Sequence, residues 1–275
     1  MIKLQEMARA RRLAVLMLVL ALAGCGVWPL DKPTASPSPL PADRLVFLVE
    51  GGAGGFTPYL HQALITPSLA VYGDGRVIEY DGEQEPSMPA SYVIASANPE
   101  LVAAFVADAE KRNLINSETD FGDPRVTDMP STTVQLYGTN GLSRISVYAF
   151  GEGFDDNLRP AQRRARKELA EVIDRAYAVS ANTERSPYRP DRVRVTEFSD
   201  GGNGQAAEWP GPDPNGFLVP AKPGSILVAC GDLSGSVAEM AYDAARGNPG
   251  GIWTWNSKRR VLAVVPLLPA LEACA

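Results

Sequence analysis

The stretch SLAVYGDGRVIEY, residues 68–80, predicts a β-hairpin at the centre of this chain's fold. Its two halves are rich in apolar and β-branched residues, and they flank the turn Gly73-Asp74-Gly75. An Asp-Gly turn between such halves indicates a tight hairpin, because its turn residues must adopt positive φ. We therefore expect antiparallel strands here.

Further strands are expected on both sides of this hairpin. A second hairpin is predicted where residues 132–137 and 142–150 meet at Asn140-Gly141. Apolar and polar side chains alternate in both halves, which is typical of a sheet with one buried and one solvated face. Residues 44–50 and 91–96 are short apolar runs bounded by turn residues, and they are expected to be strands as well.

Two helices complete this N-terminal part. Asn98-Pro99-Glu100 predicts a helix start, with a capping side chain, a proline in the first turn and an acid near the positive end of the dipole. An apolar face follows as far as Ala109, and a longer amphipathic helix is expected at 160–179. Antiparallel hairpins packed with helices indicate an α+β fold.

The C-terminal part has a similar building plan. Residues 181–191 are mostly polar and contain two prolines, so we expect a linker there. Strands are predicted at 192–198 and 225–230, a helix at 236–246 and a closing hairpin within 252–265. Both parts thus follow the order strand, helix, strand, strand.

The N-terminus has the layout of an export signal. A basic start precedes eleven apolar residues, 13–23, about half the ~20 that a membrane-spanning helix needs. The run Leu22-Ala23-Gly24-Cys25 then resembles the lipobox of bacterial lipoproteins. This resemblance implies cleavage before Cys25, a diacylglycerol on its sulfur and acylation of the new amino terminus. An ordinary cleaved signal is the alternative.

Lipidation would leave Cys230 and Cys274 as an even pair. Because exported proteins can form disulfides, we expect a bond that ties the C-terminal tail to the strand ending at Cys230. Two buried thiols are the alternative. The expected organisation is a signal peptide at 1–24, a proline-rich tether at 25–43, an N-terminal α+β domain at 44–180, the linker at 181–191 and a C-terminal α+β subdomain at 192–275.

The charge of the mature chain limits its partners. Without residues 1–24, it has 22 basic and 31 acidic side chains, a net charge of −9. Such a chain has no electrostatic attraction to nucleic acid or to anionic lipid surfaces. We expect no nucleic-acid partner.

The sequence does not predict a catalytic site, a metal site or a cofactor. Its single histidine, His61, cannot form a zinc-binding HExxH pair, and it is expected to be an ordinary polar residue. The segment 231–235 places Ser234 one position too late for a GxSxG nucleophile elbow. The glycine-rich segment 51–55 lacks the lysine of a phosphate-binding loop, which favours a permissive strand end over an anion cradle.

Three groups of side chains have both a functional and a structural interpretation. Acidic residues crowd one loop without EF-hand spacing, so turn and capping roles are favoured over calcium binding. They are Glu118, Asp120, Asp123 and Asp128. A basic helical turn is followed by acids and is expected to be a solvated face. It comprises Arg163, Arg164, Arg166 and Lys167.

Tryptophans form the third group. Trp253 and Trp255 lie two apart on one strand, so they share a face. They are candidate partner-binding residues, but ordinary aromatic burial favours a place in the core. Trp209 has the same two interpretations.

Residues 69–177 are similar to domains of exported actinobacterial lipoproteins that have no assigned activity. The likeness is carried by LAVYGDGRVI at 69–78, the helix around Phe105, TDMPSTTV at 127–134, and Pro266-Leu267-Leu268-Pro269 before Glu272 and Cys274. It implies an envelope location and no catalytic residue. A fainter resemblance, from Gly251 to Cys274, is to secreted subtilisin inhibitors.

Together these features predict a membrane-anchored, non-catalytic binding or interaction module on the extracytoplasmic face of the membrane. Its expected partners are the bilayer, through acylated Cys25, and an envelope protein. One alternative is an envelope hydrolase or transferase that uses Asp120, Asp123 and Asp128. The other is a protease-inhibitor-like protein.

Overall fold

The computed structural model describes residues 39–82, 85–151, 153–199, 204–221, 227–272 and 274. All of them belong to one compact unit, Pro37–Ala275. The expected signal peptide, Cys25 and most of the expected tether lie outside these residues. The described part contains five α-helices, one 3-10 helix and thirteen strands. The strands form two sheets, which confirms the α+β class. No described helix is both long and apolar enough to cross a membrane.

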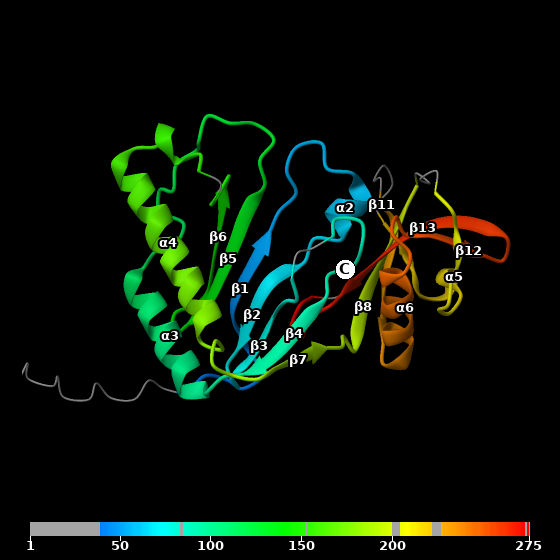
Figure 1. The fold of residues 1–275 in the computed structure, drawn as a ribbon, viewed down its shortest axis with the longest axis horizontal. Coiled ribbons are helices and arrows are strands. Elements are labelled where there is room, and N and C mark those ends of the chain that lie inside the picture. Colours follow the sequence, from blue (N-terminus) through cyan, green and yellow to red (C-terminus); the bar gives the residue numbers. More distant parts are fainter. Residues whose placement is uncertain are drawn as a thin grey trace, which may run out of the picture. The chain divides into compact units, whose positions relative to one another are not determined.

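The first sheet contains seven antiparallel strands in the order β6-β5-β1-β2-β3-β4-β7 (Figure 1). Their bounds are β1 Leu45–Gly51, β2 Pro67–Tyr72, β3 Arg76–Tyr80, β4 Tyr92–Ser96, β5 Ser131–Gly138, β6 Gly141–Tyr148 and β7 Arg185–Tyr188. Both predicted hairpins are confirmed, as β2–β3 and β5–β6. Gly75 and Gly141 each adopt φ +94°, a conformation that side chains other than glycine rarely tolerate.

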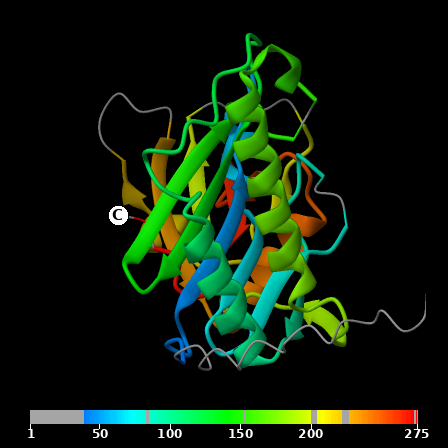
Figure 2. The same ribbon diagram turned by 90° about the vertical axis from the view of Figure 1, so that its left-hand side faces the viewer.

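Helices α3 (Pro99–Arg112) and α4 (Pro160–Ala178) cover one face of this sheet (Figure 2). The Asn98 side chain caps α3 by accepting a hydrogen bond from the Glu100 N–H at 2.9 Å, as the sequence predicts. Phe105 of α3 meets Phe47 of β1 edge-to-face, with ring centroids 5.1 Å apart. We call this sheet and its two helices the first module; the 3-10 helix Asp155–Asn157 precedes α4.

The second sheet has the order β10-β11-β8-β13-β12-β9. Its strands are β8 Arg192–Phe198, β9 Ala207–Glu208, β10 Val219–Pro220, β11 Leu227–Ser234, β12 Ile252–Trp255 and β13 Lys258–Pro266, with the short helix α5 Pro214–Phe217 between β9 and β10. Helix α6 (Ser236–Arg246) packs on one face, and this sheet with α6 is the second module. The five-residue helix α2 (Tyr59–Ala63) comes from the first half of the chain, yet Leu60, Ala63 and Leu64 in and beside it pack on the opposite face of the second sheet.

The expected linker differs from the structure, because β7 lies inside it and pairs with β4 at the edge of the first sheet. Tyr188 packs edge-to-face against Tyr92, and Arg185 reaches the buried Glu79 carboxylate at 2.8 Å. An edge strand tolerates Pro187, because its outer side makes no ladder hydrogen bonds. The polar composition of residues 181–191 therefore did not indicate the strand that lies within them.

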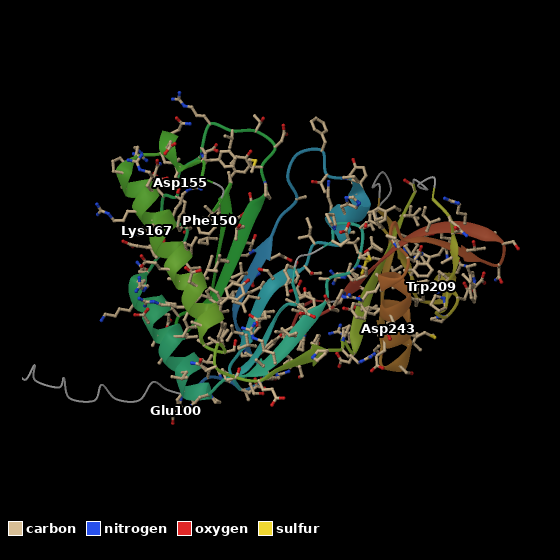
Figure 3. All side chains as sticks on the ribbon, in the orientation of Figure 1. Glu100, Phe150, Asp155, Lys167, Trp209 and Asp243 are labelled. Carbon is tan, nitrogen blue, oxygen red and sulfur yellow. A yellow bond between two sulfur atoms is a disulfide. The ribbon has the colours of Figure 1, made fainter. Side chains whose placement is uncertain are left out.

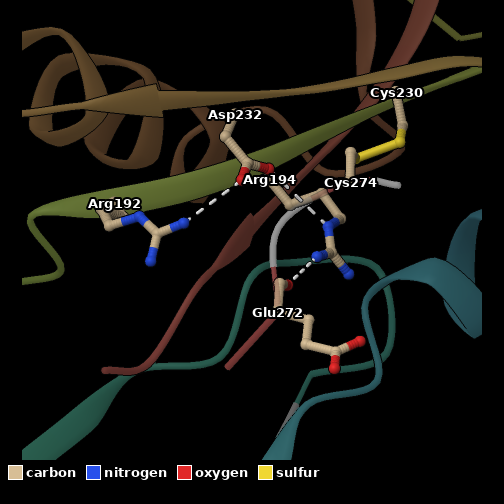
Figure 4. Close-up of a disulfide and its surroundings, with 6 residues drawn as sticks. All are labelled: Arg192, Arg194, Cys230, Asp232, Glu272 and Cys274. Atoms are coloured by element: carbon tan, nitrogen blue, oxygen red, sulfur yellow. Dashed lines mark hydrogen bonds and ion pairs between the residues drawn. A yellow bond between two sulfur atoms is a disulfide. The ribbon is translucent and has the colours of Figure 1, made fainter. Parts of the chain in front are cut away.

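The predicted disulfide between Cys230 and Cys274 is confirmed, with a Cα–Cα distance of 6.0 Å. It holds the tail that follows β13, residues 267–272, which we call the C-terminal strap. Leu268 of the strap is fully buried under the first sheet, and the Tyr72 hydroxyl donates to the Pro269 carbonyl at 2.9 Å. Near the disulfide, the Arg194 side chain donates to the Glu272 carbonyl (Figure 4). The strap thus connects the two modules.

Candidate functional site

Two adjoining cavities lie at the end of β1, and we call them together the glycine-loop groove. The larger has a volume of about 400 Å³, and its lining includes Pro58, Pro86, Pro130 and the main chain of 52–54. The smaller, of about 230 Å³, is lined partly by the hydroxyl-bearing side chains of Ser68, Tyr80 and Thr132. Gly52 and Ile65 line both cavities, so the groove is continuous.

Glycines form one wall of the groove because the chain there runs close to other backbone. The Gly52 N–H donates to the Ser131 carbonyl at 2.6 Å, and a Cβ at Gly52 would lie 2.9 Å from that same oxygen. At Gly54 a Cβ would lie 2.6 Å from the Asp128 carbonyl. A larger residue at either position would displace backbone. The segment that the sequence presented as a permissive strand end is therefore a closely packed wall.

Tyr80, which lines the polar end of the groove, belongs to a set of tyrosine hydroxyls that have partners inside the protein. Tyr80 donates to the Thr66 carbonyl at 2.5 Å, and Tyr92 donates to the Thr66 hydroxyl at 2.6 Å. Tyr177 donates to the Ser68 hydroxyl at 3.3 Å. Burial raises the pKa of Tyr80 and, more strongly, of Tyr92, so both remain neutral donors. The side chains that line this end of the groove are therefore polar and uncharged.

Glu50 lies on β1 next to residues that line the smaller cavity. Burial raises the pKa of its carboxyl, and the nearby Arg144 partly opposes that rise. A carboxyl whose pKa is raised is a candidate general acid, but the residues that line the smaller cavity include no second carboxylate to pair with it as in glycoside hydrolysis. In the described part of the chain, no three His, Cys, Asp or Glu side chains come together as a metal site would require.

Exposed aromatic side chains stand beside the groove. Phe56 is 98 % exposed, and Tyr59 at the start of α2 is 52 % exposed. Thr57 and Pro58, which lie between them in the sequence, line the larger cavity, whereas neither ring does. Exposed aromatics next to a concave apolar surface are typical of protein interaction sites. The sequence analysis missed this pair, although an aromatic residue inside a glycine- and proline-rich turn is a signal for it.

Two residues of the acidic loop have contacts within the protein. Arg159 and Gln162 both donate to the Asp120 carboxylate. The pKa of Asp120 is lowered first by the Gln162 hydrogen bond and then by the Gly122 N–H. Asp128 lies against Gly55 at the wall of the groove. Asp120 is thus a turn residue, since its carboxylate also accepts from the Gly122 N–H at 2.9 Å.

The prediction that Arg166 belongs to a solvated face is wrong. Its side chain is 2 % exposed and donates to the carbonyls of Phe121 at 2.8 Å, Ala149 at 2.9 Å and Tyr148 at 2.7 Å. Burial lowers the pKa of the guanidinium, and the nearby carboxylates oppose this. Arg163, Arg164 and Lys167 are exposed as expected, and Figure 3 labels Lys167 on the outer side of α4. Arg166 thus satisfies loop carbonyls that the sequence pattern could not place near α4.

The tryptophan candidates occupy the core of the second module. Trp253 is 1 % exposed, and its indole N–H donates to the Leu262 carbonyl at 3.0 Å. It meets Trp209 edge-to-face at 5.2 Å (Figure 3 labels Trp209). Trp255 is partly buried against the same core. Trp253 is therefore a core residue, and its side chain is not accessible to a partner.

A comparison of this chain with protein-family models, curated proteins and solved structures found no match.

Proposed function

We propose that this protein is a lipid-anchored component of the bacterial cell envelope that binds a partner through the glycine-loop groove and catalyses no reaction. The observation that carries the binding role is the cavity of about 400 Å³ at the end of β1, whose lining includes Pro58, Ile65 and Pro86.

The anchoring role is supported by the sequence at Leu22-Ala23-Gly24-Cys25. The disulfide between Cys230 and Cys274 fits an exported protein, because the cytosol keeps such thiols reduced. With two or more acyl chains on the new N-terminal cysteine, membrane attachment would be stable.

No observation favours the other candidates. Asp120 of the expected carboxylate set is engaged with Arg159 and Gln162. The segment that the disulfide braces carries the buried Leu268 and lies under the first sheet, whereas an inhibitor presents an exposed reactive loop.

Replacement of the lipidation residue tests the anchor. The full-length wild type and Cys25→Ala are expressed in a bacterium with a lipoprotein pathway and fed labelled palmitate. We expect label and membrane sedimentation for the wild type, and neither for Cys25→Ala. The double variant Cys230→Ser/Cys274→Ser is the matched control and should keep its label. A Cys25→Ala protein that still sediments with membranes, or a wild type without label, would contradict the proposal.

A further inference from the structure

Strand β6 ends the first sheet on one side, and it differs from the other strands that end a sheet (Figure 1). The others are short: β7 has four residues with Pro187 among them, β10 is Val219–Pro220 and β9 is Ala207–Glu208. Short edge strands and prolines are devices that keep a sheet edge from pairing with another chain. In contrast, β6 has eight residues, no proline and no register shift against β5. It is thus the one long and regular edge strand in the described part of the chain.

The ladder between β5 and β6 decides which backbone groups of β6 point outward. The Ala149 N–H donates to the Pro130 carbonyl at 2.9 Å, which continues that ladder past the end of β6. Because bonded residues alternate in an antiparallel pair, the odd-numbered residues of β6 bond β5 and the even-numbered ones point their N–H and C=O groups away from it. Leu142, Arg144 and Ser146 therefore present their backbone groups at the edge. Among the described strands, β6 pairs with β5 alone.

The side chains of the same residues lie on an exposed surface. Leu142 is 63 % exposed, and Arg144 and Ser146 are exposed as well. Arg144 is the single charged residue of β6. On the other face of the strand, Ile145 and Val147 are buried in the core that the sheet shares with α3 and α4. An added strand would therefore extend the ladder and cover Leu142 without opening the core.

A second copy of this chain fits the edge in one register. Around a twofold axis β6 meets itself antiparallel, and only residues with outward backbone groups bond each other. Two such registers pair most of the strand, one centred on Arg144 and the other on Ile145. The first places two guanidiniums directly opposite each other, which is destabilising. The second places Arg144 opposite Ser146 of the second copy. It also places the exposed Leu142 opposite Tyr148 of the second copy, which is a favourable aliphatic–aromatic pair.

We propose that two copies of this protein join through β6 in the register centred on Ile145, so that their first sheets become one continuous sheet. Arg144 and Ser146 of each copy then exchange pairs of N–H···O bonds with Ser146 and Arg144 of the other. A strand of another protein would use the same backbone groups, but Arg144 is the one charged side chain there that would select its sequence. The dimer goes beyond the proposed function and needs neither the groove nor the anchor.

Sedimentation equilibrium of the full mature protein in density-matched detergent tests the dimer. Ser146→Pro removes an outward N–H that β5 does not use, at an exposed position. Ser146→Ala is the matched control, because it keeps that N–H. We expect the mass of two chains for the wild type and for Ser146→Ala, and an affinity lower by ~10-fold or more for Ser146→Pro. Far-ultraviolet circular dichroism checks that each variant folds.

Charge replacements test the register and do not depend on proline. Ser146→Lys places an ammonium opposite Arg144 of the second copy, so the dissociation constant should rise about fivefold or more. The double variant Arg144→Glu/Ser146→Lys places opposite charges there and should restore the dimer. In the register centred on Arg144 it would instead oppose two glutamates, so a double variant that stays as weak as Ser146→Lys would contradict the proposed register.

A wild type with the mass of one chain throughout the concentration range, or a dimer unaffected by both Ser146→Pro and Ser146→Lys, would overturn the inference. A monomeric wild type that cross-links in cells to another envelope protein, and loses that product in Ser146→Pro, would assign the edge to a strand of that protein instead. The Cys25→Ala protein should also form the dimer, so failure of the anchor and failure of the edge are distinguishable.

Discussion

Removal of the disulfide should lower the stability of the folded unit without changing its structure. The perturbation is the double replacement Cys230→Ser/Cys274→Ser. Both cysteines are partly exposed, so serine creates no buried cavity at either position. In the folded state the strap keeps other contacts, since Leu268 is fully buried and Pro269 accepts a hydrogen bond from Tyr72. The effect should therefore arise in the unfolded chain.

The sequence separation of the two cysteines, 44 residues, sets the size of the effect. The chain-entropy relation gives about 4 kcal/mol at 25 °C for a closed loop of that length. A urea dependence of ~2–3 kcal/mol per molar is reasonable for a unit of this size, so the midpoint should fall by about 1.5 M.

Urea unfolding followed by tryptophan fluorescence measures this shift. The wild type is tested oxidised and after reduction with dithiothreitol, beside the double variant. Reduced wild type and double variant should unfold together, below the oxidised protein. Mass spectrometry must first show the bond in the oxidised sample. A double variant with the midpoint of the oxidised protein would refute the reasoning, because it would mean that the cross-link does not restrict the unfolded chain.

Two further replacements probe buried charge. Arg166→Met should lose about 3–5 kcal/mol of unfolding free energy, because three buried carbonyls lose their donors. The control Arg164→Met, at an exposed position of the same helix, should stay within ~0.5 kcal/mol of the wild type. Urea unfolding of both variants measures the difference, and equal midpoints would contradict the role of Arg166. Glu50→Gln should stabilise the protein at pH 7 and change it little near pH 4. Burial raises the pKa of the Glu50 carboxyl above its ordinary value of 4.5, so wild-type stability falls as the pH rises through that region, and an uncharged amide removes the penalty. Urea midpoints at both pH values test this, with the exposed Glu100→Gln as control, and a Glu50→Gln protein less stable at pH 7 than the wild type would show the opposite sign.

The hairpins were predictable because their turns place a local requirement on the backbone. Gly75 and Gly141 occupy the positive-φ positions, and few other residues can do so. Strand β7 was not predictable, because Arg185-Ser186-Pro187-Tyr188 shows no alternation and its stability comes from Tyr92 across the sheet. The order of the strands also escapes local patterns, since β1 lies between β2 and β5, which are distant in the sequence.

The candidate site was less predictable than the fold, because its parts meet only in three dimensions. Its lining comes from residues near 49–68 and from Tyr80, Pro86, Pro130 and Thr132. Sequence reasoning named Trp253 as a partner-binding candidate from its residue type, yet the type alone does not distinguish an exposed anchor from a core ring. Arg166 shows the same limit for charge, because only the folded chain reveals the carbonyls that surround it.

The second module determines the shape of a groove that lies mostly on the first. Helix α2 has five residues and no side-chain cap, so it is too short to be stable alone. It is held because Leu60, Ala63 and Leu64 pack on β13 and β8 of the second sheet, which leaves Pro58 and His61 to line the groove.

The same support reaches the wall that carries Pro86. The Tyr242 hydroxyl of α6 donates to the Ala90 carbonyl at 2.7 Å, and the Gly250 N–H donates to the Ser87 carbonyl at 3.3 Å. Two walls of the groove are thus fixed by contacts with the second module, and the disulfide-held strap adds another connection between the modules. The shape of the groove on the first module therefore depends on contacts with the second module, so a substitution in that interface should alter the groove without touching its lining.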